Sequence, residues 1–174
     1  MKHPLESLPE HARKPMFYIF FALTMVIFGV FRTAEPYLRT PAAPSGIVSF
    51  ELARTVSAAQ SMIDSWDANA QLYMAFGLGF DYLFMPVYAL ALSLGLLLAG
   101  SRKTGFYHAL TAWLGWGAFA AALFDVIENY ALWKELIHGV SSPLPEIAAF
   151  CATVKFVLLI VGLVAALSSR LFRN

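Results

Sequence analysis

The chain has 174 residues, of which 59% are hydrophobic and 13% are charged, and its mean hydropathy is +0.66. A soluble domain usually carries about 25% charged residues, so this composition argues against a soluble protein and for a membrane protein. The net charge of +1, without a dense Lys/Arg run, gives no reason to expect nucleic acid as a partner. The single cysteine, Cys151, excludes an intrachain disulfide and a CxxC motif.

Four apolar runs are long enough to cross a bilayer as helices, because the hydrocarbon core needs roughly 20 apolar residues per helix. They cover about residues 16–31, 70–99, 107–133 and 147–169. No small-x-small cleavage site follows the first run, so it is interpreted as an uncleaved anchor. The predicted fold is all-α and integral to the membrane: a four-helix transmembrane bundle that forms a single domain over residues 1–174.

The first connection, residues 32–69, has two parts. Its first half, RTAEPYLRTPAAPSG, is rich in proline and predicts an extended linker. Residues 49–67 predict an amphipathic helix in this outer loop. Two interpretations stay open. The helix lies on the bundle or the headgroups, or it is a lid whose inward side chains come from Glu51, Arg54, Trp66 or Asp67.

Basic residues predict the orientation of the chain. Most of them fall on the side of the membrane that holds both termini, namely Lys2, Arg13, Lys14, Arg102, Lys103, Arg170 and Arg173. The other side receives the 32–69 segment, where arginines are balanced by acids. The positive-inside rule therefore predicts that both termini are cytoplasmic.

Ionisable residues interrupt three of the four spans. The stretch LFDVIENYALW places Asp125, Glu128 and Asn129 in the third span, while Asp81 lies in the second and Lys155 in the fourth. A charge near the centre of a membrane helix costs about 2.5–3.5 kcal/mol on insertion scales and normally faces the bundle interior. At a rise of about 1.5 Å per residue, these groups are expected to meet in the outer half of the bilayer.

These residues define a predicted ligand site. Its members are Asp81, Tyr88, Asp125, Glu128, Asn129 and Lys155, with Glu51 and Trp66 from the outer helix. Three carboxylates against one ammonium group predict that some carboxyls hold protons or that a cation enters. No histidine lies at matching depth, so no metal site is predicted. No GxSxG, HExxH, P-loop or GxGxxG motif occurs, so no cofactor and no catalytic residue is assigned.

The combination of GIVSFELA, GFDYLFMPVYALAL and LFDVIENYALW resembles uncharacterised small bacterial four-span membrane proteins. The resemblance covers most of residues 46–135, and DxxEN is its most specific element. It implies a shared fold and polar site, and a place in the bacterial inner membrane. At the level of architecture the chain is also similar to the sigma-2 receptor and emopamil-binding protein group. Proteins of that group hold cationic or sterol-like ligands with buried acids and aromatics.

Three functions follow from the polar site, and the sequence leaves them open. In the first, the site binds a small amphipathic or lipid-like ligand. This hypothesis includes modification of the ligand by acid–base chemistry. Alternatively, the protein is a non-enzymatic accessory subunit of a larger membrane complex. A third alternative is proton- or cation-coupled transport. The expected partners are membrane lipids, such a ligand, and further copies of the chain or a larger complex.

Overall fold

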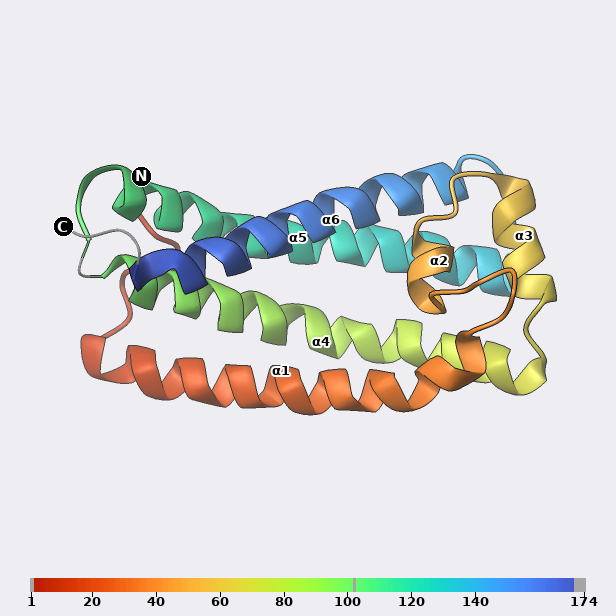
Figure 1. The fold of residues 1–174 in the computed structure, drawn as a ribbon, viewed down its shortest axis with the longest axis horizontal. Coiled ribbons are helices and arrows are strands. Elements are labelled where there is room, and N and C mark those ends of the chain that lie inside the picture. Colours follow the sequence, from red (N-terminus) through yellow and green to blue (C-terminus); the bar gives the residue numbers. More distant parts are fainter. Residues whose placement is uncertain (1, 102, 171–174) are drawn as a thin grey trace. The chain divides into compact units, whose positions relative to one another are not determined.

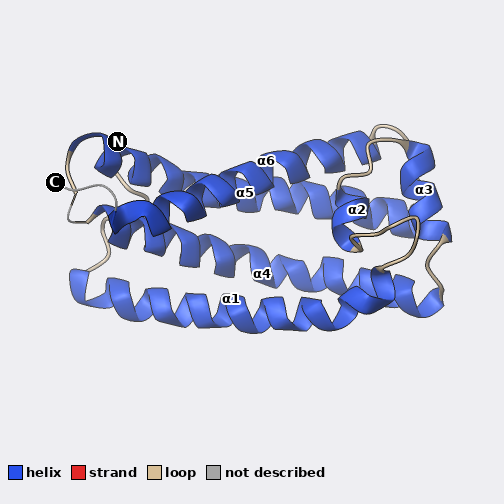
Figure 2. Ribbon diagram, viewed as in Figure 1, coloured by secondary structure: helices blue, strands red, loops and turns tan. Residues whose placement is uncertain are grey.

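The computed structural model describes residues 2–101 and 103–170, which are helical apart from short connections (Figures 1 and 2). The helices are α1 (Glu10–Leu38), α2 (Ile47–Glu51), α3 (Val56–Asp64), α4 (Ala68–Gly100), α5 (Gly105–His138) and α6 (Leu144–Leu167), and the 3-10 helix Ser168–Arg170 follows. Of these, α1, α4, α5 and α6 are long and apolar enough to cross a membrane. The predicted all-α membrane fold with a four-helix bundle is therefore confirmed. Arg102 and Arg173, which contribute to the predicted orientation of the chain in the membrane, lie outside the described residues.

The first long helix extends beyond the apolar run that predicted it. It continues to Leu38, whereas the sequence predicts an extended linker from Arg32 onward. Glu35 pairs with Arg32 three residues before it and with Arg39 four residues after it. Pairs at these spacings lie on one helix face and support the last turns of α1.

The chain forms two compact units, and each of the four long helices contributes to both. The first unit consists of residues 1–25, 85–123 and 155–174, and the second of residues 26–84 and 124–154. The single membrane domain expected for residues 1–174 stays a prediction.

The core of the second unit joins the first connection to the long helices. Trp66 donates its indole Nε1–H to the Leu38 carbonyl at 2.9 Å and packs edge to face on Phe50, with ring centroids 5.3 Å apart. The apolar cluster around them consists of Leu38, Ala43, Phe50, Ala53, Ala59, Ile63, Trp66, Ala70, Met74, Leu78, Ala131, Leu132 and Ala148. The connection is therefore packed against parts of α4, α5 and α6, because burying these apolar side chains stabilises the fold.

The first connection contains two short helices where the sequence predicts one helix over 49–67. Helix α2 ends at Glu51 and α3 begins at Val56. Between them, Thr55 has an extended backbone, with φ −138° and ψ 149°, and its Oγ1 accepts a hydrogen bond from the Ala58 amide at 3.2 Å. A threonine in this conformation is an N-cap, so the backbone leaves the helical path and starts a new helix.

In the first unit, the N-terminal segment folds back onto the long helices. His3 is buried, and Trp116 of α5 donates its Nε1–H to the Lys2 carbonyl at 3.1 Å. The ring of His3 lies against Gly115, where a Cβ atom would overlap it. Glycine at this position therefore provides the space in which the histidine ring packs.

Candidate functional site

The buried acids of the third span lie on one face of α5. Glu128 and Asn129 have no solvent exposure, and Asp125, one turn earlier, is also buried. The neighbouring Val126 and Ile127 are exposed and apolar, as expected for side chains that face lipid. This arrangement follows from the cost of placing a charge in hydrocarbon, which turns the polar face of a membrane helix toward the protein interior.

Asn129 connects α5 to α4. Its Nδ2 donates to Asp81 Oδ2 at 2.8 Å and to the Leu78 carbonyl at 3.3 Å. The bond to Asp81 is the shorter of the two. The Oδ1 atom is buried and accepts no hydrogen bond from the described residues. Both donors of the amide are thus used within the protein, while its acceptor is left for another group.

Tyr82 lies close to Asp81 and Asp125. Its hydroxyl interacts electrostatically with Asp81 and Asp125, so these two acids from different helices share one neighbourhood. The ring itself is exposed. We use the name acidic cluster for Asp81, Asp125, Glu128 and Asn129. Asp81 is half-buried, and the other three members are buried.

Two of the four proposed lid residues face inward. Glu51, at the end of α2, and Trp66, after α3, are buried. Arg54 and Asp67 are exposed, and Asp67 caps α4 by accepting from the Ala70 amide at 2.8 Å. The part of the segment that lies in the core thus includes a carboxyl group and an aromatic ring, and its role as a lid over the polar site stays a prediction.

Lys155 and Tyr88 belong to the first unit. Both are buried, and Lys155 Nζ lies 4.8 Å from the centroid of the Phe156 ring, where a cation is attracted by the aromatic face. The predicted pairing of Lys155 with a carboxylate, and the predicted convergence of both residues on the acidic cluster, stay predictions.

Glu135 is a buried acid that the sequence did not predict. This residue is buried, and neither carboxylate oxygen accepts a hydrogen bond from the described residues. It lies two helical turns after Glu128 on α5, which continues to His138, whereas the predicted span ends at 133. The spacing of seven residues from Glu128 was the signal that could have placed it on the buried face.

In the part of the chain that the structure describes, no group of three His, Cys, Asp or Glu residues is arranged to hold a metal ion. No family model, curated protein or solved structure matches the chain. Fold and site therefore define only a class: a multi-pass helical membrane protein with buried charged residues in its spans. The resemblance to small bacterial four-span proteins stays a prediction.

Proposed function

We propose that the acidic cluster binds a small amphipathic or lipid-like ligand from the membrane. The observation that carries this proposal is the complete burial of Glu128 and Asn129 in a helix apolar enough to cross a bilayer. Burying such groups is costly unless they are paired or hydrogen-bonded, and intramembrane ionisable residues commonly mark functional sites.

The chemistry of the cluster favours a ligand that donates hydrogen bonds. Ionised carboxylates accept only, and the Oδ1 atom of Asn129 also accepts. A hydroxyl or ammonium group at one end of an apolar molecule would complement these acceptors. The exposed ring of Tyr82, beside Asp81 and Asp125, supports entry of such a molecule from lipid. If the site also reacts, proton transfer by the carboxyls is the mode that these residues offer.

Native mass spectrometry with lipidomics tests this proposal. Wild type is compared with an Asp125→Asn/Glu128→Gln variant and with Asp64→Asn, an exposed acid of the same unit. We expect one specific molecule to co-purify with wild type and Asp64→Asn and to be lost from the double variant. Identical bulk lipids on three equally well-folded proteins would contradict the proposal.

A structural role is the second candidate, and the contacts of Asn129 favour it. Both amide donors connect α5 to α4, as expected if the polar groups only hold helices of an accessory subunit in register. In that case Asp125→Asn and Lys155→Met should each reduce the folded yield. If the two side chains form a pair, combining the changes should recover part of it. A ligand site predicts instead that the single changes spare folding and remove the bound molecule.

We infer further that the protein lies in a bacterial inner membrane with cytoplasmic termini. Four crossings place both termini on one side, and Lys2, Arg13, Lys14 and Lys103 belong to that side, which supports this orientation. The reactivity of Ser142→Cys with a membrane-impermeant maleimide in whole cells tests it. Labelling from outside is expected, and labelling only after lysis would reverse the orientation.

A further inference from the structure

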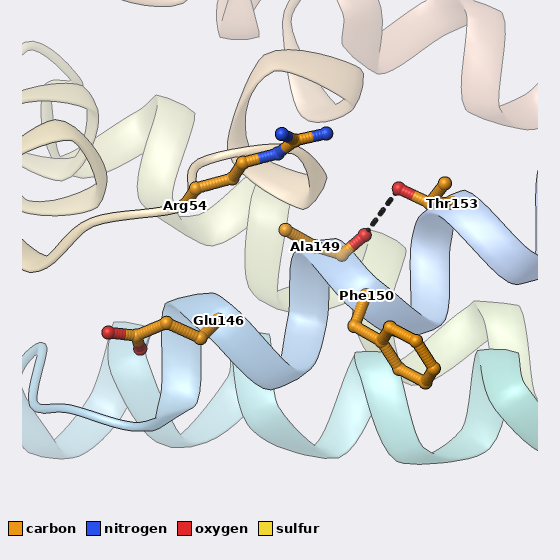
Figure 3. A pocket seen from close by; sticks show the side chains of 5 residues that line it. All are labelled: Arg54, Glu146, Ala149, Phe150 and Thr153. Atoms are coloured by element: carbon orange, nitrogen blue, oxygen red, sulfur yellow. Dashed lines mark hydrogen bonds between the residues drawn. The ribbon is translucent and has the colours of Figure 1, made fainter.

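A separate pocket of ≈330 Å³ lies in the second unit, on the outer surface of α6 (Figure 3). Its lining residues are Arg54, Glu146, Ala149, Phe150 and Thr153. None of them belongs to the acidic cluster. Phe150 is 63% exposed, so the pocket opens onto the surface that faces lipid. Bilayer lipids are therefore the molecules that can reach this pocket.

One part of this pocket carries a positive charge. Arg54 comes from the connection between α2 and α3, and its side chain extends above α6 toward Thr153 (Figure 3). Among the described residues, Arg54 makes no hydrogen bond and no ion pair. Thr153 is already occupied, because its Oγ1 donates to the Ala149 carbonyl at 2.7 Å. The guanidinium is thus available for an anion, and its planar fork of donors fits a phosphate.

Another part carries a negative charge. The Glu146 side chain points away from the Arg54 guanidinium (Figure 3), and its Oε1 accepts one bond, from Ser142 Oγ at 3.2 Å. Glu146 also interacts electrostatically with Glu135, whose two buried oxygens accept no hydrogen bond from the described residues. Glu146 is thus the acid of the pocket lining, and its carboxylate attracts a cation that donates several hydrogen bonds.

We propose that the pocket binds the headgroup of a zwitterionic phospholipid with a primary amine, of the ethanolamine type. Arg54 receives the phosphate, the ammonium group lies toward Glu146, and an acyl chain runs over Phe150. An ammonium group has three N–H donors for carboxylate oxygens. A quaternary choline has none, and it is usually held by a cage of several aromatic rings, whereas the pocket lining has one. A purely anionic headgroup would be repelled by Glu146.

This proposal is independent of the proposed function, because it uses different residues. The test is native mass spectrometry of the full chain after exchange into an equimolar mixture of ethanolamine, choline and glycerol phospholipids. We expect wild type to retain the ethanolamine lipid about tenfold more than the other two, a ratio that corresponds to about 1.4 kcal/mol. Equal retention of the three lipids by wild type would overturn the proposal.

Separate variants test the contacts to the two charges of the headgroup. Arg54→Gln should lower retention of all three phospholipids about tenfold, whereas Glu146→Gln should remove only the preference for ethanolamine over choline. Both side chains are exposed, so folding should be preserved. Thr153→Trp fills the pocket without changing its charge and should reduce ethanolamine lipid as strongly as Arg54→Gln does.

Two controls separate this site from other causes. Arg39→Gln removes an exposed arginine of the same connection outside the pocket and should leave retention unchanged. Asp125→Asn/Glu128→Gln should likewise keep the ethanolamine lipid, even if it loses the ligand of the acidic cluster. An equal loss in Arg39→Gln and Arg54→Gln would show a general charge effect and overturn the proposed pocket.

Discussion

The two units bury different kinds of polar groups. The second unit buries Glu51, Asp125, Glu128, Asn129 and Glu135, whereas the first buries His3, Ser93, Thr111 and Lys155. Four of the five in the second unit are acids. In the first unit, Lys155 is the one buried residue, among those described, that ordinarily carries a charge at neutral pH. The cost of burying charge therefore falls mainly on the second unit.

Two neutral groups of the first unit are satisfied by hydrogen bonds within the protein, whereas the buried Ser93 Oγ makes none with the described residues. Thr111 Oγ1 donates to the His108 carbonyl of its own helix at 3.0 Å, and the Tyr107 hydroxyl donates to the Ala165 carbonyl of α6. Such bonds satisfy polar groups and connect helices without any ligand. Buried acids are costlier than buried neutral groups, so the proposed binding function belongs to the second unit. The following predictions test this division.

The largest expected effect on stability comes from replacing Trp66. It would show that the second unit also depends on its apolar core. Trp66 is 3% exposed and bonds to the Leu38 carbonyl. Trp66→Ala should lower the free energy of unfolding by about 3–5 kcal/mol, measured by denaturant titration in detergent with circular dichroism. Trp133→Ala, at a site 40% exposed, should cost less than ~1 kcal/mol. Equal losses would show that the cluster around Trp66 does not hold this unit together.

The next effect concerns the first unit and depends on pH. Burial lowers the pKa of His3 from its ordinary 6.5 to about 4; the Ser93 backbone and Glu6 oppose this change, while Arg13 and His108 add to it. The released segment protonates near 6.5, so docking is most stable above that pH. It weakens as the pH falls from 6.5 toward 4. The free energy of docking differs by at most ~3 kcal/mol between the two limits.

A spin label at Ser7→Cys, in a Cys151→Ala background, measures this release. The mobile fraction in electron paramagnetic resonance should rise as the pH falls from 6.5 toward 4. His3→Gln should remove this pH dependence, whereas Gly115→Ala should mobilise the label at every pH, because the added methyl group overlaps the ring. A label that is immobile at pH 4 in wild type would contradict the buried, neutral His3.

The third effect separates stability from ligand binding in the acidic cluster. Asn129→Leu removes two hydrogen bonds and leaves Asp81 and the Leu78 carbonyl without this donor, so it should cost about 2 kcal/mol. Asn69→Leu, at an exposed site on α4, should stay within ~0.5 kcal/mol. The same detergent titration measures both. If Asn129→Leu is neutral, the amide does not hold α5 to α4, and the structural candidate loses its main support.

The sequence predicted the spans and the burial of Asp125 and Glu128 for one physical reason. An apolar run of about 20 residues has few alternatives to a membrane helix, and a charge within it must turn inward. Glu135 was missed because it lies beyond the apolar run, where hydropathy does not distinguish a buried acid from a solvated one. The docking of His3 was missed because it depends on the space at Gly115, far away in the sequence.

The smallest effect tests the break between α2 and α3, which the apolar pattern over 49–67 did not predict. A pattern of apolar residues reports which face is buried, but it does not show where the backbone leaves the helical path; at Thr55 the side chain caps α3 by accepting from the Ala58 amide. Thr55→Ala should cost about 1 kcal/mol. The Ala58 amide would then exchange with deuterium about fivefold faster. Thr55→Ser keeps the acceptor and should exchange like wild type. Equal exchange in Thr55→Ala and Thr55→Ser would mean that packing of Phe50 and Trp66, and not the cap, ends α2 and starts α3.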